Sequence, residues 1–506
     1  MFRPVFASVI ALILVWGSAS AQAAGDLDEL LRVIPEDANV LMVVRVQDIL
    51  KSPRAAKEDW AKKQEEAYLA GAEAIPPWLS VIVRATHLHL EDSSIGWSVG
   101  VARTMGPANM QRIAEHNSGI VEKIGKSQVV KTQEKGFFTQ LGPKMIGVIA
   151  PAYRQQAAKW LKFASSNTES RLPAYLAEAA QNPAPIVIAI DTQDMIDPDS
   201  LRNWLKSTKS LEGKPGKVDG VSYIYNNLKG ITVAVTFGEQ TTMQLTLNLG
   251  VPVGINSLEV KRTLIEYLED SGAAFSDLNN AELTAKDKVV TLTAPLTDAG
   301  LRRIFSLIIT PNPGGSHSMS ETPPVPQADV DAKKSKTASQ RYFTQVDQMI
   351  DDLSNKTARA NNYDRTAVWH DSYAKKIDSL SLKDVDPALA DYGRNISQKL
   401  RAIGASLRGV SLKLSTAQNS LVVDYSVDAG NFGGWNAGGY LGGAAMYSPP
   451  TWRATSNLED VRKRQADAVV KGADQREQIW QSIESDRQDI RKKMLETFGE
   501  DFTQGK

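Results

Sequence analysis

Two histidines one residue apart are the first candidates for chemistry in this chain. His87 and His89 lie in a segment that alternates apolar and polar residues, and Glu91 follows at the same spacing. In a β-strand a period of two places all three side chains on one face, where imidazoles and a carboxylate can share a metal ion. A complete site would need another of the chain's five histidines, which are otherwise His116, His317 and His370. The interpretation that the sequence favours is an ordinary polar strand face, with Leu88 and Leu90 turned to the core.

A second candidate is Ser372-Tyr373-Ala374-Lys375, which matches the Ser-x-x-Lys pattern of penicillin-binding enzymes. That pattern places a nucleophilic serine one helical turn from its base. The Ser-x-Asn and Lys-Thr-Gly elements that accompany it do not occur here in a sensible arrangement. We therefore expect Ser372 and Lys375 to lie on a solvated helix face.

Paired acids are a third candidate, because two carboxyl groups that flank a glycosidic bond can hydrolyse it. The chain offers Asp351 with Asp352, and Asp191 with Asp194. Among 58 acidic residues such pairs are expected by chance. We therefore assign no catalytic, cofactor-binding or metal-binding residue and expect no cofactor.

Phosphate-binding and hydrolase signatures are absent from the sequence: it has no Walker loop, dinucleotide fingerprint, Gly-x-Ser-x-Gly elbow or His-Glu-x-x-His motif. The segment Gly213-Lys214-Pro215-Gly216-Lys217 is rich in glycine and lysine. Pro215, and the lack of a strand before it, favour a surface loop.

The first 25 residues have the three parts of a secretory signal peptide. Arg3 precedes an apolar run over 5–16, and small residues that include Ala21 and Ala23 follow. The run spans about 18 Å as a helix, whereas a bilayer core needs about 30 Å. We therefore expect cleavage after Ala23 and a soluble periplasmic or secreted protein; the alternative is an uncleaved signal anchor.

Composition excludes several classes of protein. Basic and acidic residues balance at 58 each, so the chain has no overall positive field for nucleic acid. It contains no cysteine, which rules out disulfides, thiol catalysis, thiolate metal sites and a cysteine-linked lipid anchor. A chain of 506 residues can bury enough apolar surface to fold without such links.

Residues 34–310 alternate strand-like and helix-like patterns, which predicts an α+β fold. The clearest hairpin joins Ile231–Phe237 to Met243–Leu249, where large apolar residues occupy every second position. Further strands are expected at 39–46, 81–90, 95–103, 128–132, 136–141, 144–150, 185–191, 282–285 and 288–294. Helices are expected at 47–69, 107–116, 153–164, 198–207, 257–268 and 297–308.

The order of these elements repeats: strand, helix, hairpin, helix, hairpin and helix occur twice. We predict two tandem halves, 34–182 and 183–310, each with an antiparallel sheet covered by helices. The repeat suggests an internal duplication, although the two halves share little residue identity.

The sequence after the second half has a different pattern of apolar and polar residues. A disordered linker is expected at 311–338, because it has almost no large apolar residue. A helical domain follows at 339–426, in which Leu389, Ile396 and Ile403 recur every seven residues as in a coiled coil. Asp386-Pro387 is a good N-cap and first turn for that helix.

The last segments are a Gly/aromatic loop at 427–455 and a C-terminal helix at 456–498 that opens with the capping box Ser456-x-x-Glu459. The aromatic residues of the loop could stack on sugars or enter an interface. The alternative is an irregular loop between domains that has no binding role. The helix could mediate self-association or dock on the helical domain.

The chain resembles large exported proteins of unknown function that are abundant in planctomycete-type bacteria. The resemblance rests on Ile34–Val46, on Ser339-Gln340-Arg341-Tyr342-Phe343 and on the segment from Ile479-Trp480 to Met494. It implies a bacterial envelope location and supplies no activity or ligand. We therefore expect a non-catalytic periplasmic scaffold or binding protein of the cell envelope, with an envelope protein or glycan as its partner. The alternative is an envelope hydrolase acting on glycan or peptide.

Overall fold

The structure is a computed structural model that describes residues 26–499 and Phe502, except for 70–77, 89–94, 117–118, 133–135, 152, 271–272, 308–327, 355–365, 381, 383, 408–411, 418–419 and 426–471. The expected signal peptide at 1–23, the Gly/aromatic loop at 427–455 and the Ser456 capping box lie outside the described residues. So do His89, Glu91 and His317.

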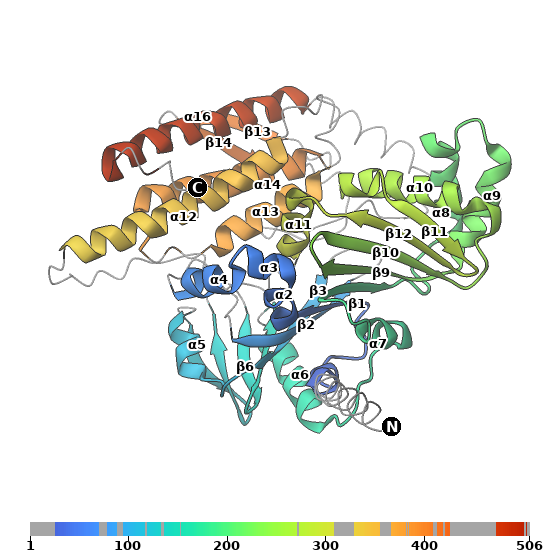
Figure 1. Ribbon diagram of the computed structural model, residues 1–506, viewed down its shortest axis with the longest axis horizontal. Coiled ribbons are helices and arrows are strands. Elements are labelled where there is room, and N and C mark those ends of the chain that lie inside the picture. The colour runs from blue at the N-terminus through green and yellow to red at the C-terminus, as the bar shows by residue number, and fades with distance from the viewer. Residues whose placement is uncertain are drawn as a thin grey trace, which may run out of the picture.

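Twelve strands form one antiparallel sheet (Figure 1). They are β1 Val40–Arg45, β2 Leu79–Leu88, β3 Ile95–Thr104, β4 Ile120–Ile124, β5 Ser127–Lys131, β6 Phe137–Gly142, β7 Met145–Ala150, β8 Ile186–Asp191, β9 Leu228–Phe237, β10 Thr241–Leu249, β11 Glu282–Lys286 and β12 Val289–Pro295. Their order is β11-β12-β10-β9-β8-β1-β2-β3-β7-β6-β5-β4. The expected α+β fold is thus confirmed.

The two halves of the chain share this sheet and meet where β1 pairs with β8. The pairing is antiparallel, with Val43 opposite Val187. On one side of the joint the strands run β1, β2, β3 and β7, and on the other side β8, β9, β10 and β12. This order is compatible with the predicted repeat, and an internal duplication stays a prediction.

The central strands are apolar on both faces, which explains their position in the middle of the sheet. Leu41 and Val43 of β1 belong to one core, whereas Met42 and Val44 belong to the other. The first core is completed by the helical residues 26–31, by α6 Arg154–Ser166 and by α7 Ala174–Ala180. Figure 1 shows α6 and α7 below the sheet.

We call residues 26–307 the sheet region. The other helices of this region lie on the opposite face of the sheet. In the first half these are α2 Val46–Leu50, α3 Pro53–Lys57 and α4 Trp60–Leu69, while α5 Met110–His116 packs near β5. In the second half they are α8 Pro198–Ser207, α9 Pro215–Asn226, α10 Ser257–Asp270 and α11 Asp298–Leu307, with short 3-10 turns η1 Lys209–Leu211, η2 Gly254–Asn256 and η3 Ser276–Leu278.

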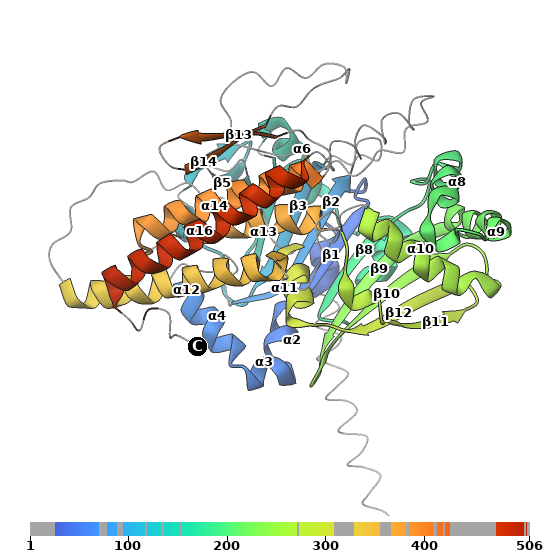
Figure 2. The ribbon, with the colours of Figure 1, turned by 90° about the horizontal axis from the view of Figure 1, so that it is seen from above.

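Among the described residues, four helices form the helical region: α12 Ala328–Ser354, α13 Ala367–Ser379, α14 Pro387–Leu407 and α16 Ala473–Phe498. A hairpin of β13 Leu412–Ala417 and β14 Ser420–Tyr425 follows α14. The apolar core continues from the sheet into this region through residues such as Trp369 and Phe275, whose rings meet edge to face at 5.7 Å. Figure 2 shows the helical region and α9 at opposite ends of the molecule.

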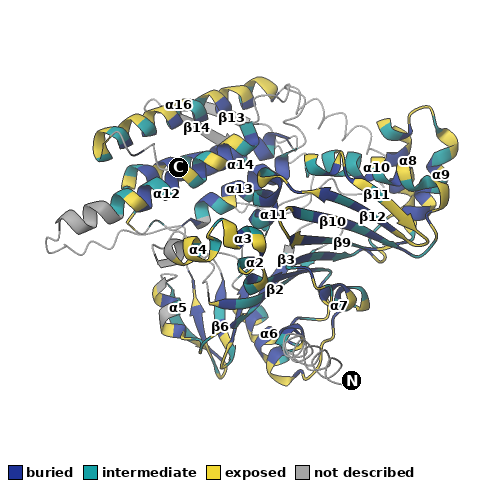
Figure 3. Ribbon diagram, in the orientation of Figure 1, coloured by how far each residue is buried: buried dark blue, intermediate teal, exposed yellow. Residues whose placement is uncertain are grey.

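Within the described part of the chain, no helix other than α7 covers one face of the sheet in the second half. Thr232, Thr246, Thr291 and Thr284 form a row in register across β9, β10, β12 and β11. The alternate positions of β10 are buried, as Figure 3 shows for this part of the sheet. This alternation is typical of an antiparallel sheet with one solvated face.

Local sequence explains where the structure differs from the expected elements. The single helix expected at 47–69 is wrong: it is three helices, because Ser52 caps a new helix through the Ala55 backbone N–H and Pro53 occupies its first turn. Asp59, with φ 53°, separates α3 from α4.

The segment expected as a surface loop at Gly213–Lys217 runs into α9, which starts at Pro215. Helix α12 begins at Ala328, before the expected end of the linker at 338, and the β13–β14 hairpin lies within the expected helical domain. The expected Asp386 cap is confirmed: its Oδ1 accepts a hydrogen bond from the Ala388 N–H at 2.8 Å.

Candidate functional site

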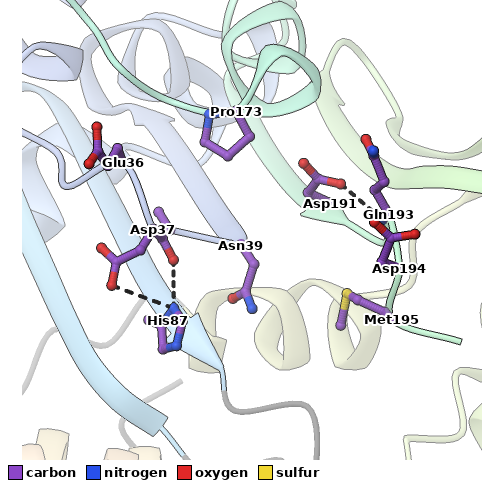
Figure 4. A pocket seen from close by; sticks show the side chains of 10 residues that line it. Glu36, Asp37, Asn39, His87, Pro173, Asp191, Gln193, Asp194 and Met195 are labelled. Carbon is purple, nitrogen blue, oxygen red and sulfur yellow. Dashed lines mark hydrogen bonds and ion pairs between the residues drawn. The ribbon is translucent and has the colours of Figure 1, made fainter.

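An acid-lined hollow of about 380 Å³ lies at the β1–β8 joint (Figure 4). It forms because the antiparallel pairing places the start of β1 beside the end of β8, where the Asp191 N–H donates to the Asn39 carbonyl at 3.0 Å. The lining acids are Glu36, Asp37, Asp191 and Asp194. No lysine or arginine is among the described residues that line it.

One wall of the hollow is held by contacts around Asp37. His87 lies 2.6 Å, through Nδ1, from the Asp37 carbonyl oxygen, and the Trp97 indole N–H donates to Asp37 Oδ2 at 3.1 Å. The two rings are stacked with centroids 6.2 Å apart. Asn39 exchanges two hydrogen bonds of 2.8 Å with the backbone of Leu88. These side chains thus fix the turn before β1 against β2.

The other wall is the turn after β8. Asp191 Oδ1 accepts a hydrogen bond from the Gln193 N–H at 3.0 Å, and Asp194 has a left-handed backbone with φ 58°. Figure 4 shows Asp191 and Asp194 across the hollow from Asp37 and His87. The arrangement gathers negative charge that attracts cationic groups.

The candidate metal ligands are only partly placed by the structure. His87 lines the hollow, whereas His370 is completely buried in α13, with Nδ1 2.8 Å from the Thr366 carbonyl oxygen. The described part of the chain contains no group of three or more histidines and acids that could hold a metal ion.

The paired acids Asp351 and Asp352 face arginines. Asp352 is nearly buried and accepts two hydrogen bonds from Arg302, at 2.6 and 2.7 Å, and one from the Tyr373 hydroxyl at 3.1 Å. Asp351 lies 2.8 Å from the Arg487 guanidinium. Both acids therefore tie α12 to other helices, α11 and α13 through Asp352 and α16 through Asp351.

These contacts shift the pKa values of their partners. The hydrogen bonds from Arg302 to Asp352 raise the pKa of Arg302. Burial alone lowers the pKa of Arg487, but its contacts with Asp347 and Asp351 outweigh burial and raise that pKa above its ordinary value. Both guanidinium groups are thus held in the charged form.

A buried lysine joins α14 to α16. Lys399 is 1% exposed, and its ammonium group contacts Asp486 and donates to the Ser482 hydroxyl at 2.7 Å. Asn395 Nδ2 donates to Asp486 Oδ2 at 2.7 Å. Sequence reasoning missed this network, although Lys399 lies one turn after Ile396 in the apolar stripe, which was a usable signal.

Ser372 is half-buried and Lys375 exposed on α13, and neither lines the described hollow. Glu36, Asp37 and Asn39 were not singled out from the sequence, because nothing local connects them with Asp191, which is far along the chain.

Comparisons with known proteins give no family. No protein-family model and no curated protein matches the chain. Solved structures of TP0453 are similar in part: crystal form III aligns with a TM-score of 0.33 and 12% identity over 52% of this chain and 92% of that chain. Crystal form I aligns with a TM-score of 0.33 and 10% identity over 55% and 97%. Among the described residues, no helix combines the length and the apolar character needed to cross a membrane.

Proposed function

We propose that this chain is an exported bacterial envelope protein that binds a partner without catalysing a reaction. The sheet region is the scaffold and the helical region is the binding module. The partner is an envelope protein or glycan. The proposal includes cleavage of the signal peptide after Ala23 and kinship with the exported proteins that the sequence resembles.

The observation that carries this proposal is that acidic residues of the helical region contact side chains of neighbouring helices. A catalytic carboxyl group must reach substrate, but Asp352 faces Arg302 and Tyr373, and Asp351 faces Arg487. Such contacts serve to fix helices against each other. They support a rigid module that presents its outer surface.

The outer surface of α16 offers a direct test, because Lys492 and Lys493 are exposed there. Purified full chain is immobilised and incubated with envelope extract and with isolated glycan. We expect specific capture that is lost when both lysines are changed to glutamate. The matched control changes Lys159 and Lys162, two exposed lysines of α6, to glutamate. Equal capture by both variants would contradict the binding role of the helical region.

Export is tested by the N-terminal sequence of the protein recovered from the envelope fraction. We expect it to begin at Ala24. A cytosolic protein that keeps Met1 would overturn the envelope location.

A second candidate, an envelope hydrolase, rests on the hollow at the β1–β8 joint. There the structure brings Asp191, Asp194 and His87 together. The test is release of soluble fragments from envelope glycan and from peptide by the purified chain. Activity that Asp191→Asn abolishes would establish this candidate in place of the first.

A further inference from the structure

Three exposed apolar side chains gather at one end of the molecule. Tyr223 of α9 is 60% exposed, Ile255 of η2 86% and Leu258 of α10 45%. We call these three residues the apolar tip. They account for three of the eight large apolar side chains that are exposed among the described residues, so their grouping calls for an explanation.

Short contacts bring the tip together. Gly220 of α9 lies so close to Asn256 that a Cβ there would be 2.8 Å from its Nδ2, and Lys217 Nζ donates to Asn256 Oδ1 at 3.1 Å. Tyr223 follows Gly220 by about one turn of α9. Ile255 and Leu258 lie on either side of Asn256 in the chain. The three side chains therefore come from adjoining elements.

Positive charge surrounds the tip. Arg262 is exposed one turn after Leu258 on the same face of α10. Lys286 and Lys288 are exposed in the β11–β12 turn, which contacts η2 through the 3.0 Å hydrogen bond from the Val253 N–H to the Asp287 carbonyl. Lys214 and Lys217 lie 4.0 and 3.9 Å from the carboxylate of Glu259, and Arg202 pairs with Asp219. Asp287 lies between Lys286 and Lys288 in the turn.

We propose that the apolar tip docks on an anionic lipid bilayer. Protruding apolar side chains enter the boundary between headgroups and acyl chains, while the surrounding lysines and Arg262 attract anionic headgroups. The shape of the site favours lipid over protein. Ile255 is 86% exposed on the short turn η2, which packs against α9. In both views α9 lies at the end of the molecule opposite the helical region (Figures 1 and 2). Three side chains also form a smaller surface than the roughly 800 Å² that each partner buries in a stable protein complex.

The test uses the absence of cysteine in this chain. Ile255→Cys provides one labelling site for a dye whose fluorescence depends on solvent polarity. Ile120→Cys is the matched control, because Ile120 is 72% exposed on β4, at the far edge of the sheet. The full-length variants are mixed with vesicles of phosphatidylcholine alone or with phosphatidylglycerol added.

We expect the dye at position 255 to shift to shorter wavelength with the anionic vesicles, and the dye at position 120 to stay unchanged. Binding through the apolar run at 5–16 would not produce this difference. Vesicle sedimentation should show about tenfold weaker binding for Leu258→Ser, which removes apolar contact area. Ile120→Ser should bind like the unchanged chain.

A second experiment measures vesicle binding after the charges near the tip are reversed. Lys286→Glu with Lys288→Glu should weaken binding to the anionic vesicles by about tenfold or more, and the salt dependence should decrease. Thermal unfolding checks that each variant is folded. An unchanged dye spectrum at 255, or equal binding by Leu258→Ser, would overturn the proposal. So would a dye at 255 that responds to an envelope protein fraction and not to vesicles. None of these three outcomes bears on partner capture by α16, so the two proposals fail separately.

Discussion

The sheet region and the helical region are held together by different forces. The centre of the sheet has apolar side chains on both faces, whereas the helices enclose Lys399, Arg487 and Asp352 among their apolar residues. Apolar burial is non-directional, and the screening by salt that weakens interactions between charges does not act on it. Buried ion pairs require matched geometry, and the loss of one partner is costly. The comparison shows how one chain can combine a tolerant scaffold with a strictly specified helix packing.

The largest expected loss comes from the sheet region. Leu176 of α7 is fully buried against the central strands, and Leu176→Ala should lower the free energy of unfolding by about 3 kcal/mol, because it leaves a cavity. Urea unfolding at low and at high salt measures this loss. The difference between variant and parent should be the same at both salt concentrations; a strong salt dependence would contradict the apolar account.

A loss of the same size is expected in the helical region from Asp486→Ala, which leaves the Lys399 ammonium buried without its counter-charge. We expect a cost of about 3 kcal/mol. Hydrogen exchange of the α14 and α16 amides should increase, while that of β1 and β8 changes little. Adding Lys399→Met should restore most of the stability, since a buried apolar side chain needs no partner. If the double variant is no more stable than Asp486→Ala, the ion pair is not the cause.

Alkaline pH should lower the stability of the helical region more than that of the sheet region. Burial raises the pKa of Tyr342, Tyr373 and Tyr392 in the helical region and of Tyr175 and Tyr225 in the sheet region; the rise is smallest for Tyr175. The unfolded chain loses these phenolic protons near pH 10, whereas the folded chain keeps them. The tyrosines' contribution to the free energy of unfolding is therefore present below pH 10 and is lost as the pH rises above it. The helical region should therefore open first in a pH titration followed by hydrogen exchange.

Tyr392→Phe sharpens that prediction, because the buried Tyr392 hydroxyl has no hydrogen-bond partner among the described residues. We expect this variant to gain about 1 kcal/mol at neutral pH and to lose less stability above pH 10. Tyr373→Phe is the control, since its hydroxyl donates to Asp352 and its removal should destabilise the protein at neutral pH.

The smallest effect is expected on the open face of the sheet. Thr246 lies in the threonine row and is half-buried, so Thr246→Val should change the free energy of unfolding by about 0.5 kcal/mol or less. Thermal unfolding measures it. A larger loss would show that the threonine row contributes structurally, which would weaken the contrast between the two regions.

Local patterns predicted most of the strands, although β4, β13 and β14 were missed, but they did not predict the contacts between distant segments. Period two predicted the β9–β10 hairpin, because one face is buried and the other solvated. Helix α9 was missed, because Pro215 and Gly216 at its start are also typical of loops. The hollow could not be predicted, since it exists only where β1 pairs with β8. The ion pairs of Asp351 and Asp352 likewise depend on arginines far away in the sequence.

Among the described residues, the sheet ends at two edge strands, β11 and β4, each paired on one side only. A free edge exposes backbone N–H and C=O groups that can recruit a strand from another molecule and start a fibre. Here both edges are short and charged: Glu282 and Lys286 are exposed at the two ends of β11, and β4 carries Glu122 and Lys123. Charges in this position oppose the addition of a strand from another molecule along either edge of the sheet.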